Sequence, residues 1–139
     1  MAADPSPLAR AVARVGDRWT LLVVEALLDG PRRFGEVQAA VTGIAATVLS
    51  QRLKHLEREG LVTSRRYSQR PPRHTYSLTE SGAELAGALL LLTAWGAASS
   101  DETGSPAHSL CGTALEPRWY CGTCDTTVAS PEADELRYA

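Results

Sequence analysis

The sequence predicts a mainly α-helical domain that carries one small β-hairpin and is followed by a short β-rich appendage. Apolar residues recur at helical spacing in successive segments that glycine or proline separates. Two alternating runs flank a segment with two prolines and four arginines, which is typical of a hairpin. Three cysteines and a histidine follow a stretch rich in Ser, Asp, Glu, Gly and Pro. We therefore expect a domain over residues 1–97, a linker over 98–107 and a Cys/His tail over 108–139.

Two helices are expected before the central segment. Leu8, Val12 and Val15 form one apolar stripe on a helix that begins at Pro7. Asp17 is expected to cap the next helix by accepting a hydrogen bond from a free backbone N–H. The expected buried face of that second helix consists of Trp19, Leu22, Val23, Ala26 and Leu27.

A pair of helices joined by a glycine turn forms the centre of the sequence. A short helix is expected from Phe34 to Val41, a turn at Gly43 and a longer helix from Ala45 to Glu59. Leu49, Leu53 and Leu56 share one face of the longer helix. The opposite face holds hydrogen-bonding and cationic side chains, namely Thr47, Gln51, Lys54 and Arg58, with Ser50 at its edge. Such a face suits the major groove of DNA, so the fold class predicted is a winged helix-turn-helix.

The expected hairpin supplies the wing. Two short strands are expected around Arg65-Arg66 and Tyr76. Leu61–Thr63 and His74–Leu78 alternate as strands do, and the two prolines between them are expected to form a stiff hairpin tip. Its arginines are expected to contact phosphates or to enter the minor groove, and they are Arg65, Arg66, Arg70 and Arg73. Arg33, just before the short helix, is also a candidate DNA contact. The alternative is a loop that only adds solubility.

The charge distribution favours nucleic acid although the net charge is −2. Residues 44–78 hold seven bases against two acids, whereas residues 79–139 hold two bases against nine acids. A phosphate backbone responds to the local patch more than to the total charge.

The last helix of the domain predicts a partner surface. It is expected to begin near Thr79, with Thr79 or the pair Ser81 and Glu84 as its cap. Leu85, Leu89, Leu92 and Trp95 form its apolar stripe, which Leu90 and Leu91 widen. A helix that is apolar on more than one side should meet a second partner. We expect a two-fold homodimer built from this helix, over residues 80–97, and the N-terminal helix.

The tail predicts a zinc site. His108 and Cys111 form one candidate ligand pair, and Cys121 and Cys124 form the other, as in a zinc ribbon. Two alternatives stay open. One is a redox-active pair of Cys121 and Cys124; the other is a ribbon without metal, held by Leu115, Trp119 and Val128.

From Ser6 to Gly96 the sequence resembles the HxlR-type winged helix-turn-helix transcriptional regulators. The order and spacing of several motifs carry the resemblance. They are Gly16-Asp17-Arg18-Trp19-Thr20, Leu27-Leu28-Asp29-Gly30-Pro31-Arg32-Arg33-Phe34-Gly35-Glu36, Gly43-Ile44, Leu49-Ser50-Gln51-Arg52-Leu53-Lys54-His55-Leu56-Glu57, Gly60-Leu61-Val62, Pro71-Pro72-Arg73-His74-Thr75-Tyr76-Ser77-Leu78-Thr79-Glu80-Ser81-Gly82 and Trp95-Gly96.

The resemblance implies a homodimer joined through its terminal helices, with one recognition helix and one wing per subunit at each half-site. One residue departs from the pattern of many redox-sensing members. Those members carry a cysteine just before the proline of the first helix, where this sequence has Ser6. A hydroxyl cannot form a sulfenate or a disulfide, so a thiol switch is not expected there.

The function expected is therefore a sequence-specific regulator of transcription that binds double-stranded DNA, acts as a homodimer and represses by occlusion. No apolar run is long enough for a membrane span and no secretory signal stands out, so a cytoplasmic location is expected. No enzyme motif stands out either. The alternatives are a thiol- or metal-dependent redox protein using the tail, and a protein-interaction adaptor. A small aromatic ligand, a metal or an oxidant is a candidate effector.

Overall fold

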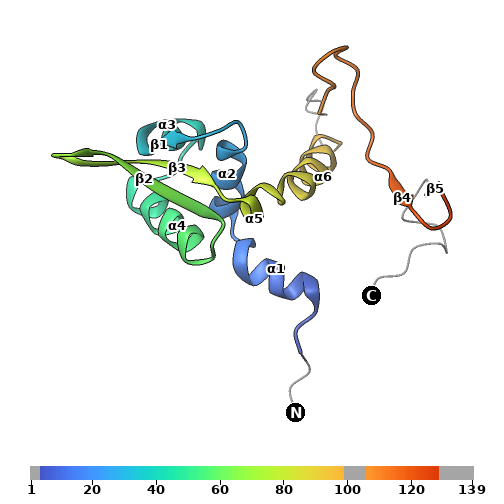
Figure 1. Ribbon diagram of the computed structural model, residues 1–139, viewed down its shortest axis with the longest axis horizontal. Helices are drawn as coiled ribbons and strands as arrows, with labels where there is room; N and C mark the ends of the chain where they lie inside the picture. Colours follow the sequence, from blue (N-terminus) through green and yellow to red (C-terminus); the bar gives the residue numbers. More distant parts are fainter. Residues whose placement is uncertain (1–3, 99–105, 129–139) are drawn as a thin grey trace. The chain divides into compact units, whose positions relative to one another are not determined.

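The structure, a computed structural model, describes residues 4–98 and 106–128. Contacts divide the chain into two units, Met1–Leu89 and Leu90–Ala139. The helices are α1 (Pro7–Val15), α2 (Arg18–Leu27), α3 (Phe34–Ala40), α4 (Ala46–Arg58), α5 (Glu80–Ala83) and α6 (Ala86–Ala97). The strands are β1 (Arg32–Arg33), β2 (Val62–Gln69), β3 (Pro72–Leu78), β4 (Trp119–Cys121) and β5 (Thr126–Val128) (Figure 1). The mainly helical winged helix-turn-helix predicted from the sequence is confirmed.

Side-chain caps begin the first two helices. The Oγ of Ser6 accepts a hydrogen bond from the Ala9 N–H at 3.1 Å, and Pro7 occupies the first helical turn. Asp17 accepts from the N–H groups of Trp19 and Thr20 at 3.1 and 3.0 Å, so its predicted capping role is confirmed. Ser6 is therefore an ordered helix cap, a position where a hydroxyl serves better than an apolar group.

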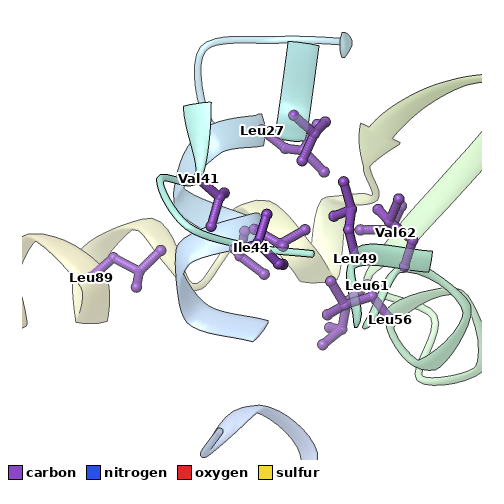
Figure 2. Close-up of a cluster of buried hydrophobic side chains, with 12 residues drawn as sticks. Leu27, Val41, Ile44, Leu49, Leu56, Leu61, Val62 and Leu89 are labelled. Atoms are coloured by element: carbon purple, nitrogen blue, oxygen red, sulfur yellow. The ribbon is translucent and has the colours of Figure 1, made fainter. Parts of the chain in front are cut away.

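The core of the first unit gathers side chains from α2, α3, α4, β2 and α6 (Figure 2). The predicted stripe of α4, Leu49, Leu53 and Leu56, is buried. The buried face of α2 differs from the prediction and consists of Thr20, Val23, Val24 and Leu27. Leu22 is exposed and Trp19 is half-buried, under the guanidinium of Arg18 at 4.4 Å. The helix is rotated because the Thr20 hydroxyl is satisfied by Asp17 and can therefore be buried.

The wing is made of longer strands than the sequence indicated. β1, β3 and β2 form an antiparallel sheet in that order. The strand expected around Arg65-Arg66 is confirmed as part of β2, and the pairing of β2 with β3 extends to Gln69 and Pro72. Only Arg70 and Pro71, joined by a cis peptide bond, form the turn. The hairpin projects beyond the helices (Figure 1), so its outer half has no core face that would show as hydrophobic alternation.

The single helix expected after the wing is divided in two. The Oγ of Thr79 accepts from the Gly82 N–H at 3.1 Å and the Thr79 hydroxyl donates to the Gly60 carbonyl at 2.6 Å. Thr79 is therefore the cap, and the capping box at Ser81 is wrong because Ser81 already lies inside α5. A Cβ on Gly82 would lie 2.1 Å from the Leu61 carbonyl oxygen. These contacts fix α5 against residues 60–61, and a turn at residues 84–85 separates it from α6.

The second unit contains a small hairpin. β4 and β5 pair antiparallel, with Trp119 opposite Val128 and Cys121 opposite Thr126. An isolated bridge joins Ala107 and Ala114. A zinc ribbon stays a prediction. Within the described ranges of the whole chain, no helix has both the length and the apolar character needed to cross a membrane.

Candidate nucleic-acid interface

Helix α4 presents the polar face that the sequence predicted. Burial of Leu49, Leu53 and Leu56 fixes the rotation of the helix. The side chains on the other side are solvent-accessible: Thr47, Gln51, Lys54 and Arg58 are exposed and Ser50 is half-buried. A helix with donors and cations along one exposed face can approach base edges and phosphates together.

One acid borders this face. A shallow groove of about 640 Å³ runs along α4, and its lining is Gln51, Arg52, Lys54, Glu57 and Arg58. Burial and the charge of Glu57 raise the pKa of Tyr76 on the neighbouring strand β3. Glu57 thus lies near the C-terminal end of the polar face.

Arg52 belongs to the scaffold. Its Nη1 lies 3.2 Å from Oδ2 of Asp17, which also accepts a hydrogen bond from the Thr20 hydroxyl. Burial would raise the pKa of Asp17, but the hydrogen bonds from Thr20 and Arg52 outweigh it and the pKa is lowered. Asp17 is thus a charged anchor that caps α2 and holds α4 against it. Among the described residues, no carboxylate pairs with the other six bases of residues 44–78.

A second anchor ties α1 to the end of α4. The Nε of Arg14 lies 2.7 Å from Oε2 of Glu59, and its Nη2 donates to the Glu59 carbonyl at 2.9 Å. The Nε2 of His55 lies 2.7 Å from the Arg14 carbonyl oxygen. His55 and Glu59 therefore serve the positioning of α1, and α4 is held at its middle by Asp17 and at its C-terminal end by Arg14.

The wing carries its arginines on both faces of the ribbon. Arg65 lies opposite Thr75 and Arg66 lies opposite His74, and successive residues of a strand point to opposite faces. A register shift between Arg66 and Ser68 places Tyr67 in a bulge. Arg70 lies in the turn and Arg73 on β3. All four arginines are exposed, as a phosphate contact requires.

Arg33 joins the base of the wing to α3. The guanidinium of Arg33 lies over the Tyr67 ring, 4.8 Å from the centroid. The backbone N–H of Arg33 donates to Oε2 of Glu36 at 2.6 Å. A groove of about 540 Å³ lies here, lined by Arg33, Phe34, Gly35, Glu36, Tyr67, Pro72, Arg73, His74 and Tyr76. Tyr67, His74 and Tyr76 were not among the predicted site residues. Nothing local in the sequence marks the bulge that turns Tyr67 toward Arg33.

A sequence model of the HxlR-like helix-turn-helix family matches residues 14–103. The chain belongs to the HxlR family. An HTH-type transcriptional regulator of Mycobacterium bovis is 38% identical over 125 residues, which span 87% of this chain and 78% of that protein. The HTH-type transcriptional regulator YodB of Bacillus subtilis is 32% identical over 101 residues, or 73% of this chain and 87% of YodB.

Solved structures of the same kind match the fold. The redox regulator HypR in its reduced form is 32% identical, with a TM-score of 0.63 over 67% of this chain and 92% of HypR. The reduced form of YodB from B. subtilis is also 32% identical, with a TM-score of 0.57 over the same shares of the two chains. As a member of the HxlR family, the chain is a DNA-binding transcriptional regulator of the winged helix-turn-helix class.

The predicted metal ligands of this HxlR-family chain lie in two pairs in the second unit. Nδ1 of His108 is 3.3 Å from Sγ of Cys111. Cys121 ends β4 and Cys124 lies in the turn that follows. All three cysteines are free thiols. Over the described residues the structure does not gather three or more His, Cys, Asp or Glu side chains at one point that could hold a metal ion.

Proposed function

We propose that this regulator binds an operator as a homodimer, with α4 in the major groove and the β2–β3 wing on the neighbouring backbone. The observation that carries the proposal is that six bases of these two elements pair with no carboxylate among the described residues, whereas Arg52 of α4 is engaged by Asp17. The contact residues proposed are Thr47, Ser50, Gln51, Lys54 and Arg58 on α4, and Arg33, Arg65, Arg66, Arg70 and Arg73 at the wing.

The two elements serve different purposes in this proposal. Gln51 and Lys54 lie near the middle of α4 and can donate to base edges, which would give sequence preference. The wing arginines lie on both faces of a two-stranded ribbon. A ribbon with cations on both faces can contact phosphates of both strands across a minor groove, which gives affinity without base preference.

A second copy of the chain is the proposed partner of two exposed apolar surfaces. On α1, Leu8 is 72% exposed and Val12 is 54% exposed. On α6, the apolar side chains that remain at least 38% exposed are Leu90, Leu91, Leu92 and Trp95. Covering such residues stabilises an assembly by roughly 25 cal/mol per Å² of apolar surface. Two-fold symmetry then matches a palindromic operator with one α4 and one wing per half-site.

Repression by occlusion is the proposed mode of action. Residues 1–97 account for DNA binding and dimerisation, and a bound dimer blocks access to the promoter it covers. Ser6 is the cap of α1, so a signal by thiol oxidation would have to enter elsewhere than at this position. Any small-molecule effector would act on the same dimer.

Fluorescence anisotropy with the upstream region of its own gene tests the contacts. Lys54→Ala should weaken binding by about 1–3 kcal/mol if it reads a base, and should relax the preference at one operator position. Arg66→Ala should weaken binding to all sequences and lower the salt slope by about 0.9. Arg118→Ala, which removes a cation of the second unit, is the control and should bind as the wild type does. Unchanged binding by both Lys54→Ala and Arg66→Ala would rule out this interface.

A further inference from the structure

Residues 106–128 of the second unit contain three thiols and an imidazole but no packed core. Among residues 106–128 none is buried. Its larger apolar side chains stay in solvent: Leu110 is 88% exposed, Tyr120 is 65% exposed and Trp119 is 50% exposed. An isolated two-stranded hairpin is only marginally stable in water. Units this small commonly rely on a disulfide or a bound metal instead of a core.

The first half of a metal site is already shaped around His108. The N–H of Gly112 donates to the His108 carbonyl at 2.7 Å, and the His108 N–H donates to the Thr113 carbonyl at 2.8 Å. Gly112 has a φ of +70°, a conformation that favours glycine. This tight turn places Nδ1 of His108 at 3.3 Å from Sγ of Cys111. Both atoms are ligands that zinc prefers.

The second half is the turn between β4 and β5. The backbone N–H groups of Cys124 and Thr123 donate to the sulfur of Cys121. The Tyr120 hydroxyl donates to Oδ1 of Asp125 at 2.5 Å and closes the turn, in which Asp125 has a φ of +51°. Backbone N–H groups directed at a sulfur stabilise the thiolate, which is the form that binds a metal.

We propose that one zinc ion joins these two halves, with His108, Cys111, Cys121 and Cys124 as its four ligands. The nine residues between Cys111 and Cys121 leave enough chain for the two pairs to meet. On binding, each cysteine gives its proton to solvent and coordinates as a thiolate, while His108 coordinates as a neutral imidazole. Zinc is favoured over harder cations because the set contains sulfur and nitrogen and no carboxylate.

The proposed site is structural. All four tetrahedral positions are taken by the protein, which leaves none for a reacting water. The free energy of metal binding then becomes folding energy for a unit that has no buried side chain among its described residues. A disulfide between Cys121 and Cys124 is the competing state. It would need an oxidant to accept two electrons, and it would leave the pair of His108 and Cys111 unused.

The metal content of the full-length protein, purified without a metal-affinity tag or added zinc, tests the proposal. The wild type should hold one zinc per chain, and Cys111→Ser, Cys121→Ser and Cys124→Ser should each lose most of it. His108→Ala should lower the affinity for zinc as measured against a chelator. His74→Ala, which changes a histidine on the wing, is the control and should keep its zinc. Substoichiometric zinc in the wild type would overturn the proposal, as would full occupancy in Cys121→Ser.

Optical spectra and thiol alkylation test which side chains bind the metal. Reloading with Co²⁺ should give thiolate-to-metal charge-transfer bands that weaken in each serine variant and persist in His74→Ala. Alkylation of the three thiols should be slow in the zinc-loaded protein and fast once a chelator is added. Rapid alkylation before the chelator is added would show that the thiols are free. An intact mass lower by two hydrogens would show a disulfide. Either result would overturn the zinc site. Far-UV circular dichroism of each variant separates loss of metal from loss of the winged-helix fold.

Discussion

At the scale of single residues, Asp17 connects two elements that lie far apart in the sequence. Its carboxylate accepts from the N–H groups that open α2 and pairs with Arg52 of α4 at 3.2 Å. The attachment of α4 to α2 therefore depends in part on a side chain outside α3 and α4. Arg33 and Tyr67 form a similar link at the base of the wing.

We expect Asp17→Ala to lower the free energy of unfolding by about 0.5–2 kcal/mol, because the cap of α2 is lost. Asp17→Asn can still cap and should cost less. Urea denaturation followed by circular dichroism measures both variants. An alanine variant as stable as the wild type would show that the cap contributes nothing.

The free energy of unfolding is expected to depend on pH through the Asp17 carboxylate. Its pKa in the folded protein is below the ordinary value of 3.8. The stabilisation is therefore fully present above that ordinary value and is lost as the pH falls through the folded pKa. In denaturation series between neutral and acid pH, Asp17→Asn should show a shallower loss of stability than the wild type. Because Asp17 is partly exposed, the difference should shrink in high salt.

Tyr67 is expected to hold Arg33 in place for DNA. Tyr67→Ala should weaken operator binding by about 0.5–1 kcal/mol, the range of an exposed cation–π contact. Tyr67→Phe keeps the ring and is the matched control. Anisotropy titrations at one fixed salt concentration compare the two variants. Equal losses in both would assign the effect to the hydroxyl instead of the stacked ring.

At the scale of elements, a few close contacts hold the junction between the wing and the last helices. Thr79 caps α5 and donates to Gly60, and Gly82 lies directly against the Leu61 carbonyl. α5 is only four residues long. Its position therefore depends on these tertiary contacts more than on helix propensity.

Two glycines of this region give a matched pair of substitutions. Gly82→Ala should destabilise the fold by about 1–3 kcal/mol, since its Cβ would meet the backbone of Leu61. Gly87→Ala, in α6, has no atom within 4 Å of its new Cβ and should be neutral or stabilising by up to about 1 kcal/mol. Thermal unfolding compares them. A tolerated Gly82→Ala would mean that α5 can move away from Leu61.

At the scale of the whole molecule, the exposed apolar residues of α1 and α6 are the feature that a single chain leaves unexplained. α1 has no buried residue although Leu8, Val12 and Val15 lie on one stripe. Large exposed apolar clusters on soluble proteins commonly mark interfaces. The proposed DNA-binding homodimer would account for them by burying both surfaces against a second copy of the chain.

Charged substitutions on these helices should therefore separate the subunits. Val12→Glu and Trp95→Glu are expected to shift the protein from dimer to monomer and to weaken operator binding, because each half-site alone makes half of the contacts. Ala13→Glu adds the same charge to α1 outside the stripe and should stay dimeric. Analytical ultracentrifugation measures the state. Dimers in both Val12→Glu and Trp95→Glu would exclude these helices as the interface.

Local patterns in the sequence determined helices α1 to α4, the caps at Asp17 and Thr79, and the exposed face of α4. These features depend on contacts within about four residues along the chain, which periodicity and capping rules describe well. They were sufficient to identify the winged helix-turn-helix and most of the candidate DNA contacts.

Only the tertiary structure decided the features that join distant residues. β1 exists because Arg32 pairs with Tyr76, and the wing strands lengthen because each completes the hydrogen bonds of the other. Arg52 is held by Asp17, which lies 35 positions away in the sequence but 3.2 Å away in space. Such pairings leave no local trace in the sequence, because the free energy that selects them arises only when the chain has folded and brought the partners together.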